Sequence, residues 1–213
     1  MKTTDRYATA GLDENENEPD SHGTVLKNMC GITTIAVMEQ AETLALLQST
    51  EEMIDRFDQH HRFSAKDIRF MHRTWLGNIY SWAGNYRQVM MSKDGFPFAA
   101  PAYIPTLMDT FEKEILTHHT PCTADPAQCA ASLAIVHVEL VLIHPFREGN
   151  GRLARLLATL MGLQAGLPIL LFDAMEAGGR EAYFAAIRAG MERNYQPMQA
   201  IFSTLIEQSG VNV

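Results

Sequence analysis

The sequence predicts an all-α domain that carries one small β-hairpin. Apolar residues recur at helical spacing in several stretches, for example between Ile68 and Ile79. Signals that start or end a helix bound most of these stretches. Residues 89–98 differ, because the pair Asp94-Gly95 lies between two short apolar arms, which is typical of a hairpin turn. With 213 residues, the chain is long enough for one domain with its own core.

The predicted helices follow one another with short breaks. Ser64 and Asp67 resemble a capping box, and Asp125 with Pro126 resembles an N-cap followed by a first-turn proline. The apolar run before His144 is long enough to be a buried central helix. We expect helices over residues 33–49, 64–79, 104–115, 130–143, 151–164, 180–193 and 197–208.

The two ends of the chain differ in composition. Residues 1–24 are polar and rich in acidic side chains, so we expect a flexible arm there and the domain over residues 25–213. The formal net charge of −8 argues against a nucleic-acid-binding protein, which usually presents a basic face. The first residues contain no apolar signal-peptide core, and no uncharged apolar run approaches the ~18 residues of a membrane span. We therefore expect a cytoplasmic protein with no membrane partner.

The three cysteines show no paired spacing. Cys30, Cys122 and Cys129 are odd in number, which argues against both a disulfide framework and a metal site. Cys129 falls in an apolar helical stretch and is expected in the core.

The segment His144-Pro-Phe-Arg-Glu-Gly-Asn-Gly-Arg-Leu-Ala-Arg155 combines several groups that suit phosphate chemistry. Pro145 disfavours helical geometry at His144, so the central helix should end there and hold the imidazole at its end. Gly149 and Gly151 permit a tight turn whose amides converge, just before a new helix. Such amides and a helix N-terminus together bind anions.

Charged side chains surround this turn in the sequence. Arg152 and Arg155 are three residues apart, so we expect them on one helix face, where guanidinium groups grip phosphate oxygens. Glu148 offers a hard oxygen ligand suited to Mg²⁺. His144, with an ordinary pKa of roughly 6.5, can accept a proton near neutral pH. The segment therefore predicts transfer of a phosphate-containing group.

Each of these residues alone has an ordinary structural explanation. A histidine before proline is usually structural, and Gly-Asn-Gly is a common turn; only the joint spacing argues for chemistry. A metal trio of His137, Glu139 and His144 is disfavoured, because the two histidines lie two helical turns apart and Glu139 points elsewhere.

The segment resembles the Fic signature His-Pro-Phe-x-(Asp/Glu)-Gly-Asn-Gly-Arg-x-x-Arg at every fixed position. The resemblance covers roughly residues 25 to 208. It includes Ile79–Arg87 before the hairpin, Met91–Phe98 in the hairpin, and Tyr183–Pro197, which resembles the segment that closes the adenine pocket.

This resemblance implies a protein adenylyltransferase, which moves AMP from ATP to a Ser, Thr or Tyr hydroxyl of another protein. It implies His144 as the general base and Glu148 as the ligand of Mg²⁺. The nucleotide would contact Gly149, Asn150, Gly151, Arg152, Arg155 and, in the hairpin flap, Lys93 and Asp94. Tyr183 would line the adenine site, although it could equally be a core residue, given Ile187 and Met191 on the same helix face.

The resemblance also implies partners. The target protein would dock on the flap, residues 89–98, by strand-like pairing. Patterns similar to the family's Ser/Thr-x-x-x-Glu inhibitory helix occur at Ser203–Glu207 and Thr110–Glu114, without the residue that should follow. We therefore expect no internal inhibitor, so that a small antitoxin chain inhibits the protein or nothing does.

Two alternatives to AMP transfer stay open. Relatives on the same fold transfer phosphate or phosphocholine, but those usually replace Gly149 by Ala. A non-catalytic module that binds a partner through the flap is the other alternative, although a degenerate relative should have lost His144, Glu148 or Arg152.

Overall fold

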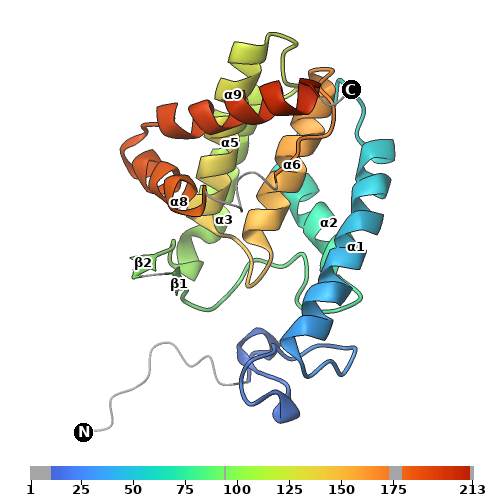
Figure 1. Ribbon diagram of the computed structural model, residues 1–213. Helices are drawn as coiled ribbons and strands as arrows, with labels where there is room; N and C mark the ends of the chain where they lie inside the picture. The colour runs from blue at the N-terminus through green and yellow to red at the C-terminus, as the bar shows by residue number, and fades with distance from the viewer. Residues whose placement is uncertain (1–10, 94, 173–178, 212–213) are drawn as a thin grey trace, which may run out of the picture.

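The computed structural model describes residues 11–93, 95–172 and 179–211, which form a helical body with a two-stranded sheet (Figure 1). The predicted all-α class is confirmed. The helices are α1 Ile35–Arg56, α2 Ala65–Leu76, α3 Ile104–Thr110, α4 Thr117–His119, α5 Pro126–Ile143, α6 Asn150–Gln164, α8 Arg180–Ala189 and α9 Gln196–Val211. Shorter helical turns are η1 Asp13–Asn15, η2 Pro19–Ser21, η3 Pro101–Tyr103, η4 Phe111–Leu116 and η5 Gly190–Glu192.

Helix α5 is the centre of the body and packs against α6, α8 and α9. Its first turn is capped as predicted: the Asp125 carboxylate accepts a hydrogen bond from the Gln128 amide at 2.8 Å, and Pro126 follows. By length and hydropathy α5 could span a membrane, contrary to our expectation that no segment qualifies. In this structure ten of its residues are buried, as in the core helix of a globular domain.

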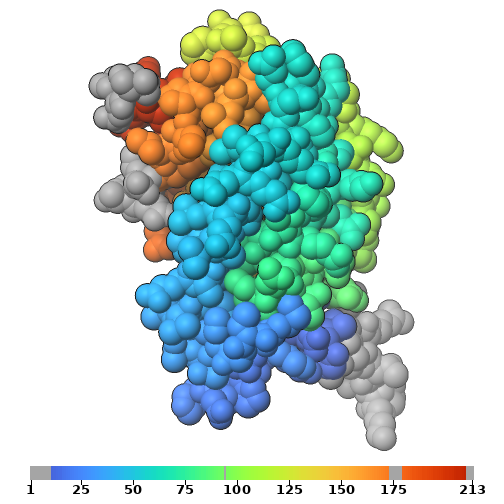
Figure 2. Space-filling view, turned by 90° about the vertical axis from the view of Figure 1, so that its right-hand side faces the viewer, coloured from blue at the N-terminus to red at the C-terminus, as the bar shows by residue number. Residues whose placement is uncertain are grey.

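Helix α1 packs against α2 and α6 and lies along the face of the molecule that Figure 2 shows. Helix α2 begins with the predicted capping box. The Ser64 hydroxyl accepts from the Asp67 amide at 3.2 Å, and the Asp67 carboxylate accepts from the Ser64 amide at 3.0 Å. Both helices therefore place side chains near α6.

The prediction of a flexible arm is corrected for residues 11–24, because this segment is bonded to the body; residues 1–10 lie outside the described part. The buried Glu14 carboxylate accepts from the Gln88 amide at 2.6 Å, and its carbonyl accepts from Arg147 Nε at 2.9 Å. Asp13 accepts from the Ser81 hydroxyl at 3.1 Å. Acidic composition did not indicate these specific acceptor roles.

The helix predicted over residues 104–115 is present, but it changes character along its length. Helix α3 continues directly into η4, which is a π-helix. Within this wider turn the Thr117 hydroxyl donates to the Glu112 carbonyl at 2.8 Å, and the Glu112 carboxylate accepts from the Ala65 amide at 2.7 Å. Apolar spacing alone does not distinguish a π-helix from an α-helix.

The predicted hairpin consists of β1 Ser92–Lys93 and β2 Phe96–Pro97, which pair in antiparallel register. Ser92 lies opposite Pro97, and Lys93 opposite Phe96. Asp94, in the turn, lies outside the described residues. Pro97 can occupy its strand because each strand of a two-stranded sheet has an edge that needs no pairing.

Cys129 is fully buried in the core, as predicted. The fold also brings Cys122 to it, with the two sulfur atoms 3.1 Å apart and both thiols free. Sequence spacing did not indicate this proximity.

The connection between α5 and α6 needs two left-handed backbone positions. His144 has φ 52° and ψ 59°, and Gly149 has φ 81°. A Cβ atom on Gly149 would lie 2.7 and 2.8 Å from two atoms of the Trp75 ring. Gly149 is therefore required both by its backbone angle and by the indole beside it.

We predict that Gly149→Ala lowers the free energy of unfolding by about 2–4 kcal/mol, since it combines a left-handed alanine with overpacking against Trp75. Gly151→Ala is the matched control, because no atom lies within 4 Å of its Cβ position, in the first turn of α6. It should leave stability unchanged or raise it by up to about 1 kcal/mol. Urea unfolding measures both, and equal effects would contradict the steric argument.

Two buried histidines, His72 and His137, are kept neutral by the fold. They are 0% and 1% exposed, and burial lowers the pKa of each to about 4. Between the unfolded pKa of roughly 6.5 and this folded value, only the unfolded chain takes up the proton. Acidification through this range therefore favours unfolding.

We predict that each of these histidines lowers the free energy of unfolding by about 1.4 kcal/mol per pH unit between pH 6 and pH 5. His72→Gln should be less stable at pH 7 but should lose that share of the pH slope. The exposed His60 provides the control, and His60→Gln should leave the slope unchanged. If the free energy of unfolding of His72→Gln still falls with pH as steeply as that of the parent, His72 does not contribute to the pH dependence.

Candidate active site

The loop between His144 and Asn150 is held from within by one side chain. The buried Asn150 amide donates to the Phe146 carbonyl at 2.8 Å, and its oxygen accepts from the Phe146 amide at 2.9 Å. The sequence predicted an anion-binding role for Asn150. Its side chain closes the loop, and the predicted anion-binding role of its backbone amide stays a prediction.

His72 of α2 supports the same loop from outside. Its ring stacks on Phe146 with centroids 3.9 Å apart. Its Nδ1 accepts from the Gly84 amide at 2.8 Å, so the proton lies on Nε2, which donates to the Glu148 carbonyl at 3.1 Å. This contribution was missed, because nothing in the sequence linked His72 to a segment so far along the chain.

His144 is oriented as a proton acceptor. Its Nδ1 lies 3.2 Å from the Val141 carbonyl, which can only accept, so Nδ1 carries the proton and Nε2 keeps a lone pair. The ring stacks on Phe98 at 3.7 Å. Burial, opposed by the bond to Val141 and assisted by the charges of Arg87 and Lys93, lowers the pKa of His144 to about 4. The imidazole is therefore neutral at pH 7.

Arg87, which is 1% exposed, ties His144 to both ends of the flap. Its Nε donates to the His144 carbonyl at 2.7 Å, while its terminal nitrogens donate to the carbonyls of Val89 and Ala99, each at 2.6 Å. Its own amide donates to the Pro145 carbonyl at 2.9 Å. The sequence analysis did not single out Arg87, although it lies in the stretch before the hairpin.

His144 opens into a cavity of about 490 Å³ between the flap, α5, α6 and α8. Of the predicted nucleotide-contacting residues, those that line it are Lys93, Gly151, Arg155 and Tyr183. Arg180 and Arg188 add two cations that the sequence analysis missed. The remaining walls are apolar and come from Phe96, Phe98, Val141, Phe184 and Ile187.

Tyr183 lies between the cavity and the core, and its role at an adenine site stays a prediction. The residue lines the cavity and also packs against the core. Its hydroxyl lies 2.8 Å from Nε2 of His137, and burial raises the pKa of Tyr183 to about 12, so the phenol stays neutral. On the flap side, the Lys93 ammonium lies 4.6 Å from the centre of the Phe184 ring, which links the flap to α8.

Arg152 faces α1 and lies outside the cavity lining, unlike Arg155. Its Nη2 lies 2.6 Å from the Glu42 carboxylate and 3.4 Å from that of Glu148. The expectation that both arginines share one face is therefore corrected. Residues three apart on a helix still differ by about 60° around its axis, and the buried carboxylate on α1 directs Arg152 towards itself.

Glu148 keeps one carboxylate oxygen available. Its Oε1 accepts from the Gly149 amide at 2.8 Å, and the side chain is 42% exposed. No group of three or more His, Cys, Asp or Glu side chains suited to a metal ion is present within residues 11–93, 95–172 and 179–211. The amide of Gly149 is already used, whereas those of Asn150 and Gly151 begin α6 and have no earlier helical carbonyl to bond.

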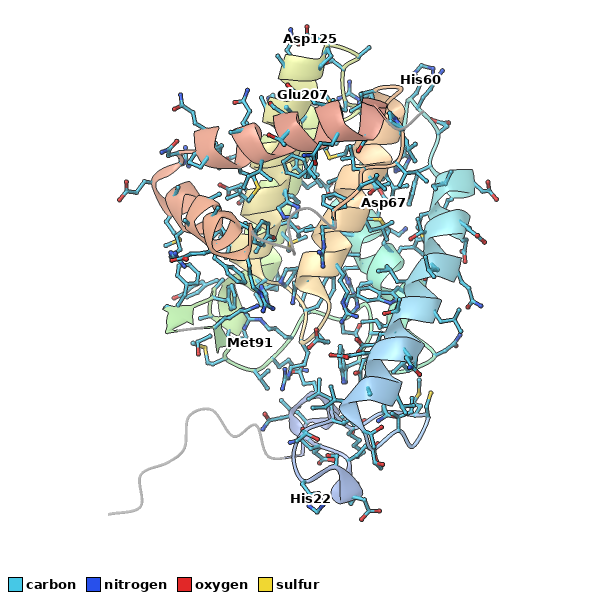
Figure 3. All side chains as sticks on the ribbon, viewed as in Figure 1. His22, His60, Asp67, Met91, Asp125 and Glu207 are labelled. Carbon is cyan, nitrogen blue, oxygen red and sulfur yellow. The ribbon has the colours of Figure 1, made fainter. Side chains whose placement is uncertain are left out.

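The Ser203–Glu207 pattern lies on α9, away from the flap. Figure 3 labels Met91 at the flap and Glu207 near the top of the view. Glu207 is not among the residues that line the cavity.

Comparison with known proteins identifies relatives. Residues 62–161 match the family model of the Fic/DOC family. The protein adenylyltransferase fic-1 of Caenorhabditis briggsae is 34% identical over 141 residues, covering 65% of this chain and 26% of the relative. The protein adenylyltransferase Fic of Drosophila ananassae is 24% identical over 204 residues, covering 95% of this chain and 40% of the relative. The chain thus spans less than half the length of these curated relatives.

Solved structures share the fold. BepC of Bartonella tribocorum, solved with bound AMPPNP, superposes with a TM-score of 0.67 at 23% identity, covering 85% of this chain and 92% of that chain. The family match contains the whole His144–Arg155 segment, and the fold likeness extends over the helices around it. Residues 62–161 of this chain form a Fic/DOC domain.

Proposed function

We propose that this protein is an adenylyltransferase, which transfers AMP from ATP to a Ser, Thr or Tyr hydroxyl of a target protein. The observation that carries the proposal is the neutral His144, whose free Nε2 lies at a cavity that also contains Arg155 and the first turn of α6. The names of the relatives from Caenorhabditis and Drosophila support the same activity. The AMPPNP bound to BepC supports a nucleoside triphosphate as the substrate.

In the proposed reaction, the target hydroxyl gives its proton to Nε2 of His144 while its oxygen attacks the α-phosphorus of ATP. The bond between the α-phosphorus and the bridging oxygen breaks, and pyrophosphate leaves with that electron pair. The Val141 carbonyl keeps the imidazole in the required tautomer, and the carbonyl bond from Arg87 fixes the backbone at this position. Arg155 and the free amides of α6 offset charge on the phosphates.

The chain fits Mg²⁺ through Glu148, which has an uncommitted oxygen and partial exposure. One carboxylate together with substrate phosphates is a common way for proteins to hold this ion. When bound, Mg²⁺ would neutralise negative charge on the phosphates of the nucleotide. His72 of α2 donates to the backbone carbonyl of Glu148 and so fixes the backbone of the residue that would hold Mg²⁺.

The proposal includes a target segment that pairs with the flap. Strand β1 is the better edge for this pairing, because Pro97 of β2 has no amide to donate. Ser92 and Lys93 are exposed, so their edge is accessible to a partner. We also propose a cytoplasmic location, and either inhibition by a separate small antitoxin chain or no inhibition.

We predict that His144→Ala lowers AMP transfer by about 10²–10⁴-fold, since the general base is lost, and changes ATP affinity by less than about threefold. Transfer is measured with α-labelled ATP and Mg²⁺ in lysate, and affinity by calorimetry on the purified variant. His60→Ala, at an exposed position, is the matched control and should retain parental activity.

Mass spectrometry of the labelled target decides between this activity and its alternatives. An adduct of AMP supports the proposal, whereas phosphate or phosphocholine on the target contradicts it. A parent protein that labels neither itself nor any lysate protein would favour a partner-binding module. If His144→Ala retains more than a few per cent of the parental AMP transfer, His144 is not the general base.

The pH dependence of kcat/KM should reflect the lowered pKa of His144. A base with a pKa of about 4 is deprotonated above that pH, so activity is retained down to about pH 5 and is lost as pH falls towards 4. Initial rates between pH 4 and pH 8, with folding checked by circular dichroism at each pH, test this. An acid limb centred near pH 6.5 would show that His144 titrates as in water.

A further inference from the structure

Glu42, near the middle of α1, is a carboxylate that the protein buries: its side chain is 5% exposed. A buried charge destabilises a fold unless charged or polar partners compensate it. Every oxygen of this residue has such a partner. Glu42 is thus built into the packing between α1, α2 and α6.

Three donors from two other parts of the chain bind Glu42. The Tyr80 hydroxyl donates to Oε1 at 2.7 Å, Arg152 Nη2 donates to Oε2 at 2.6 Å, and Trp75 Nε1 donates to the backbone carbonyl at 2.8 Å. Burial, and then the nearby Glu42 carboxylate, raise the pKa of Tyr80 above its ordinary value, so the phenol stays a donor. The guanidinium also lies 4.8 Å from the centre of the Trp75 ring.

These contacts hold Arg152 between two carboxylates, at unequal distances. Its Nη2 lies 2.6 Å from Glu42 but 3.4 Å from Glu148, four residues earlier in the chain. The closer and more buried partner therefore determines where the guanidinium lies. Without the Glu42 charge, Glu148 would be the remaining carboxylate partner of Arg152, and an arginine at this spacing can pair with it directly.

We propose that Glu42 is a positioning residue for the reaction, because it takes the shorter bond from Arg152, so that Arg152 makes only a 3.4 Å contact with Oε1 of Glu148 and leaves the other Glu148 oxygen for a divalent cation. The inference rests on the proposed function and names a residue on which that function depends. Glu42 does not line the cavity, and its contacts are those of a fixed structural element. It therefore acts through Arg152 and does not block the site.

The test is a double-mutant cycle with Glu42→Gln and Arg152→Ala, measured as AMP transfer against Mg²⁺ concentration. Glu42→Gln should raise the half-saturating Mg²⁺ concentration at least fivefold and lower kcat about tenfold. In the Arg152→Ala background, Glu42→Gln should change the half-saturating Mg²⁺ concentration and kcat by less than twofold, because Glu42 no longer has an arginine to position. Glu39→Gln, at an exposed acidic position of α1, is the matched control and should match the parent.

Several results would overturn the proposal. Equal effects of Glu42→Gln in both backgrounds would show a general structural role, and increased transfer would show that Glu42 inhibits. Tyr80→Phe removes one bond to Glu42 without changing charge, so it should shift the Mg²⁺ requirement in the same direction by a smaller factor. It serves as the second variant if Glu42→Gln does not fold, and an unchanged Mg²⁺ requirement in it would then count against the proposal.

A measurement that does not depend on activity separates this proposal from the proposed function. In the ¹⁵N-arginine NMR spectrum, the side-chain signals of Arg152, assigned with Arg152→Lys, should show restricted rotation in the parent and averaged rotation in Glu42→Gln. Restricted rotation in both proteins would refute the positioning role, even if the parent transfers AMP. If Arg152 is restricted in the parent and averaged in Glu42→Gln while the parent transfers no AMP, only the proposed function is refuted.

Discussion

The site depends on the fixed backbone of the loop between α5 and α6. Pro145 ends the helix, His144 takes a left-handed conformation, and the Asn150 side chain closes the loop on Phe146. Hydrogen bonds inside a buried loop are strong constraints, because a broken one leaves polar groups without water. The loop therefore presents the imidazole, the Glu148 carboxylate and the start of α6 in one fixed arrangement.

Residues that carry no chemistry supply most of this rigidity. His72 stacks on Phe146 and binds the Glu148 carbonyl, while Arg87 binds the His144 carbonyl and both ends of the flap. Both side chains are buried, and their polar atoms are satisfied by backbone groups. A catalytic group held through its backbone in this way keeps its side chain free for the substrate.

The charged groups divide between two sides of α6. Arg155 faces the apolar-walled cavity together with cations of the flap and α8, whereas Arg152 faces the buried Glu42. A chain with a formal net charge of −8 thus gathers positive charge where an anionic ligand would lie. Such local concentration of one sign strengthens the attraction for a phosphate-bearing substrate.

Local signals in the sequence predicted much of the fold and the reacting groups. The capping residues Ser64 and Asp125, the Asp94-Gly95 hairpin signal and the helical spacing act over a few residues, so they can be interpreted from the sequence itself. The segment from His144 to Arg155 likewise indicated a base, a carboxylate and two arginines. These properties depend on chemistry within one or two turns of chain.

The tertiary structure alone decided which distant groups meet. It directed Arg152 to Glu42, 110 positions away, placed His72 under the loop, and bonded residues 11–24 to the body. In each case a buried polar group needs a hydrogen-bond partner, and which partner it finds depends on how whole helices pack. The sequence by itself therefore determined what chemistry this protein carries, and packing decided how that chemistry is held.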